Sequence, residues 1–183
     1  YNQSLNTNGD KWDVSKVTNM SGMFQGLVYF NQSVSDWNTS SVVDMSSMFD
    51  GAAKFNQSIN TDGDKWNVSK VTNMSSMFSG AEVFDQSLSN WNTSSVVDMS
   101  SMFDDAAKFN QSINTDGDKW NVSKVTNMSG MFSSAEVFDQ SLSDWNTSSV
   151  VDMSSMFDGA AKFNQPINTD GDKWNISNVT DMS

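Results

Sequence analysis

The chain has 183 residues, with 22 acidic side chains against 10 basic ones, a net charge of -12, and neither Cys nor His. Without Cys or His it has no disulfide, no thiol nucleophile, no imidazole base and no zinc or haem site built from the usual ligands. The acidic charge argues against nucleic acid and anionic membrane surfaces as partners, because both attract positive charge. No apolar run approaches the roughly 20 residues of a membrane span, so we expect no membrane insertion in this stretch.

Tryptophan marks an internal repeat that covers the whole chain. The seven Trp residues are spaced alternately by 25 and 29 residues. We therefore interpret residues 1–183 as one continuous stretch of a longer repeat array rather than as a domain with a single core. Its units are 1–11 (partial), 12–36, 37–65, 66–90, 91–119, 120–144, 145–173 and 174–183 (partial).

Each unit places its apolar residues at the same distances from its Trp, and polar residues fill almost everything between. One unit offers too few apolar side chains to offset a backbone ordering cost of roughly 1–2 kcal/mol per residue. Stacked units can share one continuous core, which is how a solenoid is stabilised. The pattern therefore predicts a repeat solenoid.

Two segments of the unit carry local structural signals. In Val42–Ala52 the apolar residues fall three or four apart, which predicts a short helical or 3₁₀ turn with Gly51 at its C-terminal cap. In Phe55–Ile59 the alternation predicts a short strand, paired in parallel with the same strand of the next coil. The expected fold class is thus a solenoid of leucine-rich-repeat-like coils, each with one strand and one helical turn.

The run Trp37–Ile59, which reads WNTSSVVDMSSMFDGAAKFNQSI, resembles the BspA-like leucine-rich-repeat family. That family has a repeat of about 26 residues and occurs in bacterial surface proteins and lipoproteins. The resemblance implies a leucine-rich-repeat-like solenoid at a cell surface, with a role in adhesion or surface architecture. It carries over no catalytic residues.

The long units contain an Asp-Gly-Asp insert that has two interpretations. Three oxygen-bearing side chains at alternate positions suit a hard cation such as calcium, which prefers six to eight oxygen ligands. The simpler interpretation is a solvated turn rich in Asp and Gly. The calcium candidates are Asn60, Asp62, Asp64, Asn114, Asp116, Asp118, Asn168, Asp170 and Asp172.

Other recurring residues are weaker signals. The Asp or Asn seven residues after each Trp predicts either a hydrogen-bonded column along the stack or a cap for the helical turn. We expect the Met and Trp residues to fill the core, although exposed Trp would suit carbohydrate stacking. Asn-x-Ser/Thr sequons would carry glycans on a eukaryotic secretory route. The glycosylation candidates are Asn31, Asn38, Asn67, Asn73, Asn92, Asn121 and Asn146.

Near-identical units offer the same few side chains repeatedly, whereas catalysis needs different residues to converge on one place. We therefore expect no enzyme. The leading hypothesis is an extracellular or cell-surface structural array, such as a rod or filament shaft, that packs against copies of itself or against neighbouring repeats. The alternatives are an adhesin that recognises a glycan or a surface protein, and a calcium-stiffened spacer.

Overall fold

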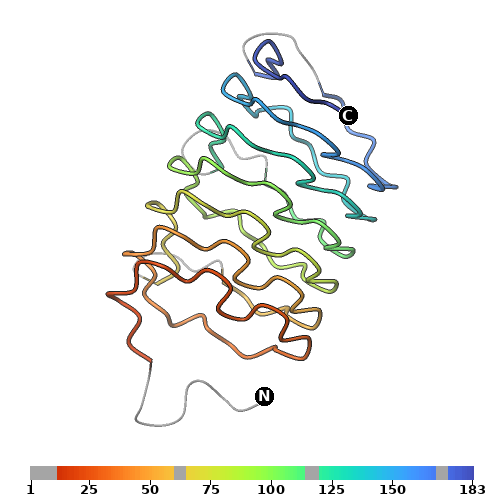
Figure 1. The fold of residues 1–183 in the computed structure, drawn as a ribbon. Coiled ribbons are helices and arrows are strands. Elements are labelled where there is room, and N and C mark those ends of the chain that lie inside the picture. The colour runs from red at the N-terminus through yellow and green to blue at the C-terminus, as the bar shows by residue number, and fades with distance from the viewer. Residues whose placement is uncertain (1–11, 60–64, 114–119, 168–172) are drawn as a thin grey trace.

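The computed structural model describes residues 12–59, 65–113, 120–167 and 173–183, which wind into successive coils lying side by side along one axis (Figure 1). The first and last described coils form opposite ends of this stack. In the described residues there is no α-helix, 3₁₀ helix or extended strand, and none of their segments is a helix that could cross a membrane. The regular element is a line of isolated parallel bridges between neighbouring coils, formed by Asn19, Asp44, Asn73, Asp98, Asn127, Asp152 and Asp181.

The expected leucine-rich-repeat-like coil, with a helical turn and a strand, is wrong. In Val42–Ala52, alternate amides leave the coil: the N–H of Ser47 donates to Ser75 O at 2.8 Å and that of Phe49 to Met77 O at 2.9 Å. The amides between them close four-residue β-turns, such as the bond from Asp50 N to Ser47 O at 3.1 Å. In a helix, the amides beyond the first turn would all bond to carbonyls of the same segment.

Backbone torsions also oppose a helix in this segment. Ser47 has a φ of 52° and Gly51 a φ of 67°, and the equivalent residues of the other described coils share this left-handed conformation. A type II β-turn requires positive φ at its third residue, whereas a right-handed helix excludes it. The glycine position was therefore recognised correctly as special, but it ends a β-turn rather than a helix.

The expected strand at Phe55–Ile59 is also absent, because a side chain takes the place of a backbone acceptor. The N–H of Asn56 donates to Asn31 Oδ1 at 3.0 Å, and Gln57 Nε2 donates to the same oxygen at 3.0 Å. The same pair of bonds recurs at each later coil. We call the residues that form this ladder the amide column: Asn31, Asn56, Asp85, Asn110, Asp139 and Asn164.

The core consists of aromatic columns that run through the stack. Phe49, Phe78 and Phe103 lie in one column with ring centroids 5.7 Å apart, and Phe55 and Phe84 lie in a second column at 5.8 Å. Within one coil Phe49 and Phe55 stack at 3.9 Å. Neighbouring coils therefore bury each other's rings, which is the shared core that the repeat predicted.

Tryptophan and methionine fill the remaining core, as predicted. The Met residues from Met20 to Met156 are buried except for the partly buried Met23, and Trp91 is 1% exposed. Trp91 Nε1 donates to Ile59 O at 3.2 Å, and the indoles of Trp66, Trp120, Trp145 and Trp174 make the equivalent bond to an earlier coil. Trp37 Nε1 is buried without a partner in the described part of the chain; the equivalent acceptor position is Leu5, outside that part.

Threonine has a structural role that the sequence did not reveal. Thr39, Thr93 and Thr147 are fully buried polar residues two positions after the Trp of each long unit. Thr39 Oγ1 donates to Asn67 O at 3.1 Å, and the other two make the same bond to Asn121 and Asn175. Each hydroxyl thus ties the long unit to the coil that follows its insert.

Candidate functional site

One side of the stack carries an exposed row that we call the Thr/Val stripe. It alternates Thr from the short units with Val from the long ones, and Val43, Val97 and Val151 are 42%, 42% and 44% exposed. Backbone bonds hold the row in register: Val43 N donates to Thr18 O at 2.8 Å, and Thr72 N to Val43 O at 2.8 Å. The stripe comprises Thr18, Val43, Thr72, Val97, Thr126, Val151 and Thr180.

The bridge residues next to the stripe form the column that the sequence predicted, although their strongest bonds are local. Asp44 Oδ1 accepts from the backbone N–H of Ser46 at 2.9 Å and from its hydroxyl at 2.7 Å. Between coils, Asn19 Nδ2 donates to Asp44 Oδ2 at 3.4 Å. The carboxylates and amides therefore cap turns. Acid and amide alternate along the column, which keeps like charges apart, except at the last bridge, where Asp152 pairs with Asp181.

An acidic edge of the stack contains Asp50 and Asp104, each of which directly follows the Met-Phe pair of its coil. Burial raises the pKa of Asp104, the nearby Asp105 and Asp50 carboxylates raise it further, and a hydrogen bond to the Ser133 side chain opposes them. In the part of the chain that the structure describes, no three metal-ligating side chains converge. Among the described residues, this edge therefore brings carboxylates near one another but does not assemble a cation-binding site.

The calcium candidates in the Asp-Gly-Asp inserts (60–64, 114–118 and 168–172) lie outside the described residues. The sequon candidates are described. Asn31, Asn38, Asn92 and Asn146 are exposed, while Asn67, Asn73 and Asn121 are half-buried. Asn31 belongs to the amide column, and the other six accept the N–H of the Ser two residues later. Glycosylation of these positions stays a prediction.

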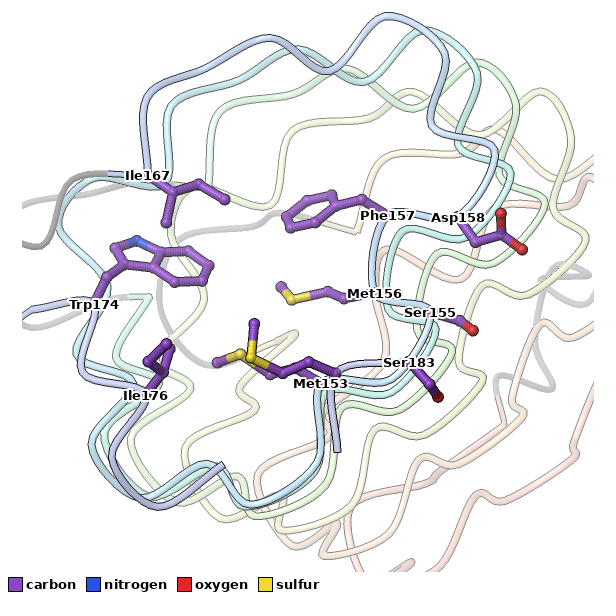
Figure 2. Close-up of a pocket in the computed structure, with 10 residues that line it drawn as sticks. Met153, Ser155, Met156, Phe157, Asp158, Ile167, Trp174, Ile176 and Ser183 are labelled. Carbon is purple, nitrogen blue, oxygen red and sulfur yellow. The ribbon is translucent and has the colours of Figure 1, made fainter. Parts of the chain in front are cut away.

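A hollow lies at the last described coil of the stack. It has a volume of about 620 Å³. Trp174, Ile167 and Ile176 line one side of the coil interior and point toward Phe157 and Met156 on the other (Figure 2). Ile167 is 42% exposed, whereas its equivalents Ile59 and Ile113 are fully buried under the following coil. The lining is apolar apart from Ser155, Asp158 and Ser183, so the hollow suits hydrophobic packing rather than acid–base chemistry.

The opposite end of the stack has an apolar edge at residues 27–29. Leu27 and Val28 are 43% and 45% exposed and Tyr29 is 75% exposed, beside a hollow of about 280 Å³. Every other complete unit has Ala where this one has Leu27. The apolar edge was not predicted from the sequence, although Leu27, Val28 and Tyr29 depart visibly from the repeat.

Comparison with known proteins adds a family and little else. A family model described as "Mycoplasma protein of unknown function, DUF285" matches residues 1–115 and 112–183. No curated protein and no solved structure matches the chain.

Proposed function

This chain belongs to the family of Mycoplasma proteins of unknown function, DUF285, and we propose that it serves as a non-catalytic structural array, a rod or spacer exposed at the cell surface. The observation that carries the proposal is the unbroken core. The Phe column from Phe24 to Phe157 runs through six successive coils with centroid spacings of 5.4–5.7 Å. Such a stack resists bending because each coil is packed on two neighbours.

Two further observations support a structural rather than a catalytic role. Each described coil offers the same side chains at the same places, and their polar groups are used to hold neighbouring coils together. The hydroxyl of Ser41, for example, donates to Ser15 O at 2.7 Å in the preceding coil. The resemblance of Trp37–Ile59 to BspA-like repeats supports a location outside the cell.

The test combines location with shape. Intact cells that express the protein would be treated with protease and probed with an antibody raised against the 183-residue chain. Loss of the epitope, with a cytoplasmic control protein left intact, would support the surface role. Protection of the epitope until the cells are lysed would contradict it. Small-angle scattering from the purified chain should separately fit a stack whose first and last described coils lie about 29 Å apart, from six spacings of about 4.8 Å.

The Thr/Val stripe favours an adhesin as a second candidate. It is a straight lateral row of methyl and hydroxyl groups, with Lys16, Lys70 and Lys124 exposed two positions before the Thr residues. A binding face of this kind would be disabled by Val97→Asp with little effect on folding, because Val97 is exposed. Binding of the wild-type chain to a glycan or surface-protein panel, lost in Val97→Asp, would favour the adhesin over the plain rod.

The calcium-stiffened spacer is the third candidate and rests on the composition of the inserts. If calcium binds these carboxylates in the folded state, the melting temperature rises as the calcium concentration is increased. An increase that is reversed by a chelator and absent in Asp116→Asn/Asp118→Asn would support this version. An unchanged melting temperature would remove it and leave the plain rod in place.

A further inference from the structure

We infer that the Thr/Val stripe is a surface of lateral self-association, on which a second copy of this chain lies side by side with the first, the two stacks running in the same direction. The inference rests on the proposed structural role and specifies how one rod contacts another. It depends on the side of the stack, which repeats from coil to coil, and not on either of its ends.

The stripe presents methyl groups to solvent in a regular row. All seven of its side chains are exposed, one from each described coil. Thr72 Oγ1 donates to Val43 O at 3.3 Å. Thr126 and Thr180 make the equivalent bond, so the polar atom of these side chains is engaged within the stack. Bridges between neighbouring coils keep the row in register at about 4.8 Å per coil.

One side of the stripe carries a row of cations that we call the lysine edge. Lys16, Lys70 and Lys124 are exposed and lie two residues before the Thr of their coils. They recur at every second coil, about 9.6 Å apart, which is twice the spacing of parallel strands. Within the described coils none of the three forms an ion pair, and the ion pairs found there all involve other lysines.

The other side of the stripe carries carboxylates, which we call the aspartate edge. Asp44, Asp98 and Asp152 directly follow the Val residues of the stripe, in the coils between those that carry Lys. Their Oδ1 atoms cap the local turn, and none of the three pairs with a lysine of the described residues. Because the exposed stripe separates the two edges, the chain leaves both sets of charges unpaired.

The two edges are complementary between copies in one orientation. A half-turn about an axis parallel to the stack brings a second stripe face to face with the first and exchanges its edges, so each lysine edge lies opposite an aspartate edge. A displacement by one coil then sets every coil with Lys and Thr level with one that carries Val and Asp. A half-turn about an axis across the stripe instead places like charges opposite each other, which costs free energy. Charge therefore selects the parallel arrangement.

The overall charge of the chain makes this pairing of charges necessary. Each copy has a net charge of -12, so two copies repel unless their contact supplies compensating charge. The lysine and aspartate edges supply it, because each lysine gains a carboxylate that its own chain does not provide. The methyl groups between the edges lose their contact with water at the same time, which is favourable.

The experiment is sedimentation equilibrium of the 183-residue chain over a range of concentrations. The wild type should show a monomer–dimer equilibrium. Lys70→Ser/Lys124→Ser removes two cations from the lysine edge, and Asp44→Asn/Asp98→Asn removes two carboxylates from the aspartate edge. Each pair introduces the residue that neighbouring coils carry at the same position, so the coils keep their hydrogen bonds. Each should raise the dissociation constant at least about tenfold.

Two further variants locate the contact. Val97→Asp places a carboxylate in the middle of the exposed stripe and should abolish the dimer. Lys108→Ser/Lys162→Ser is the matched control, because it removes the same charge from exposed positions outside the stripe and its two edges. This control should dimerise like the wild type. Near-UV circular dichroism of the buried Trp residues verifies that each variant keeps the fold.

Three results would overturn the inference. One is a wild-type chain that stays monomeric at all concentrations. Another is tighter association of either edge variant, which would show that like charges meet and that the stacks are antiparallel. The third is an unchanged dissociation constant in both edge variants. A monomeric wild type would leave the rod standing, whereas protection of the epitope in intact cells would remove the surface role without affecting the dimer, so the two proposals fail separately.

Discussion

Asp85 Oδ1 accepts the backbone N–H of Asn110, which lies 25 residues later in the next coil, at 3.0 Å, and also accepts Gln111 Nε2 at 2.8 Å. A side chain here does what a backbone carbonyl does in a sheet. Because the acceptor is a side chain, residues 55–59 and their equivalents join neighbouring coils without forming a strand.

Asp85→Ala should therefore destabilise the chain, because it leaves the N–H of Asn110 without its acceptor in a half-buried position. We expect a loss of about 1–2 kcal/mol in the free energy of unfolding, measured by urea denaturation. Asp85→Asn keeps Oδ1, as the native Asn56 and Asn110 do, and should lose much less. Equal losses in the two variants would show that the acceptor is not what matters.

Asp139 makes the same ladder pH-dependent. The backbone N–H of Asn164 and the side chain of Gln165 hold the pKa of Asp139 below its ordinary value by bonding to the charged form. A carboxyl whose pKa is depressed in the folded state contributes stability above its unfolded pKa, and this is lost as pH falls through the folded pKa. Part of the acid sensitivity should therefore appear below the ordinary aspartate pKa of about 3.9.

Asp139→Asn retains the acceptor and removes the titration. Its stability, followed by thermal melting at several pH values, should fall less steeply than that of the wild type below about pH 4. A variant whose acid limb superimposes on the wild-type curve would count against this role of Asp139.

The left-handed turn positions predict opposite effects for two substitutions. Gly80 has a φ of 63°, and an added Cβ would lie 3.4 Å from Gly51 Cα, so Gly80→Ala should cost about 1 kcal/mol or more. Ser134 occupies the equivalent position with a φ of 53°. Ser134→Gly relieves that torsional cost and should raise the urea midpoint. Changes of the same sign in both variants would be inconsistent with a conformational origin.

A substitution at Trp91 tests the hydrogen bond from the indole N–H to Ile59 O of the neighbouring coil. Trp91→Phe keeps an aromatic ring in the core but removes the donor to Ile59 O, and leaves a buried carbonyl without its partner. We expect a loss of about 1–3 kcal/mol in the free energy of unfolding, by urea denaturation. Trp12→Phe, at a half-exposed ring, is the matched control and should change stability by less than about 0.5 kcal/mol.

The repeat predicted the composition of the core but not the local backbone of the coil. Apolar periodicity reports which side chains face inward, and Phe49, Met45 and Trp91 do so. It does not report where an amide finds its acceptor. In Val42–Ala52 a spacing of three to four fits a helix and a chain of β-turns equally well. The positive φ of Ser47 and Gly51 and the amide bonds to the next coil distinguish the two.

The polar hydrogen bonds between coils could not be predicted from the sequence for a related reason. Thr39 and Asn31 are ordinary polar residues in the sequence, and their partners lie 25 to 28 residues away. Their recurrence at fixed positions was visible, but the choice between solvent and an adjacent coil depends on how the coils stack. The apolar edge at Tyr29 was visible only as a departure from the repeat.

The central claim is that the coils stack coaxially at a constant spacing. Since the chain has no native Cys, Val43→Cys/Val151→Cys can be spin-labelled cleanly at two exposed positions of the Thr/Val stripe, four coils apart. Double electron–electron resonance should give one narrow distance distribution near 19 Å, apart from the length of the labels, from four spacings of about 4.8 Å. A broad distribution, or a main distance far from that value, would contradict a regular stack.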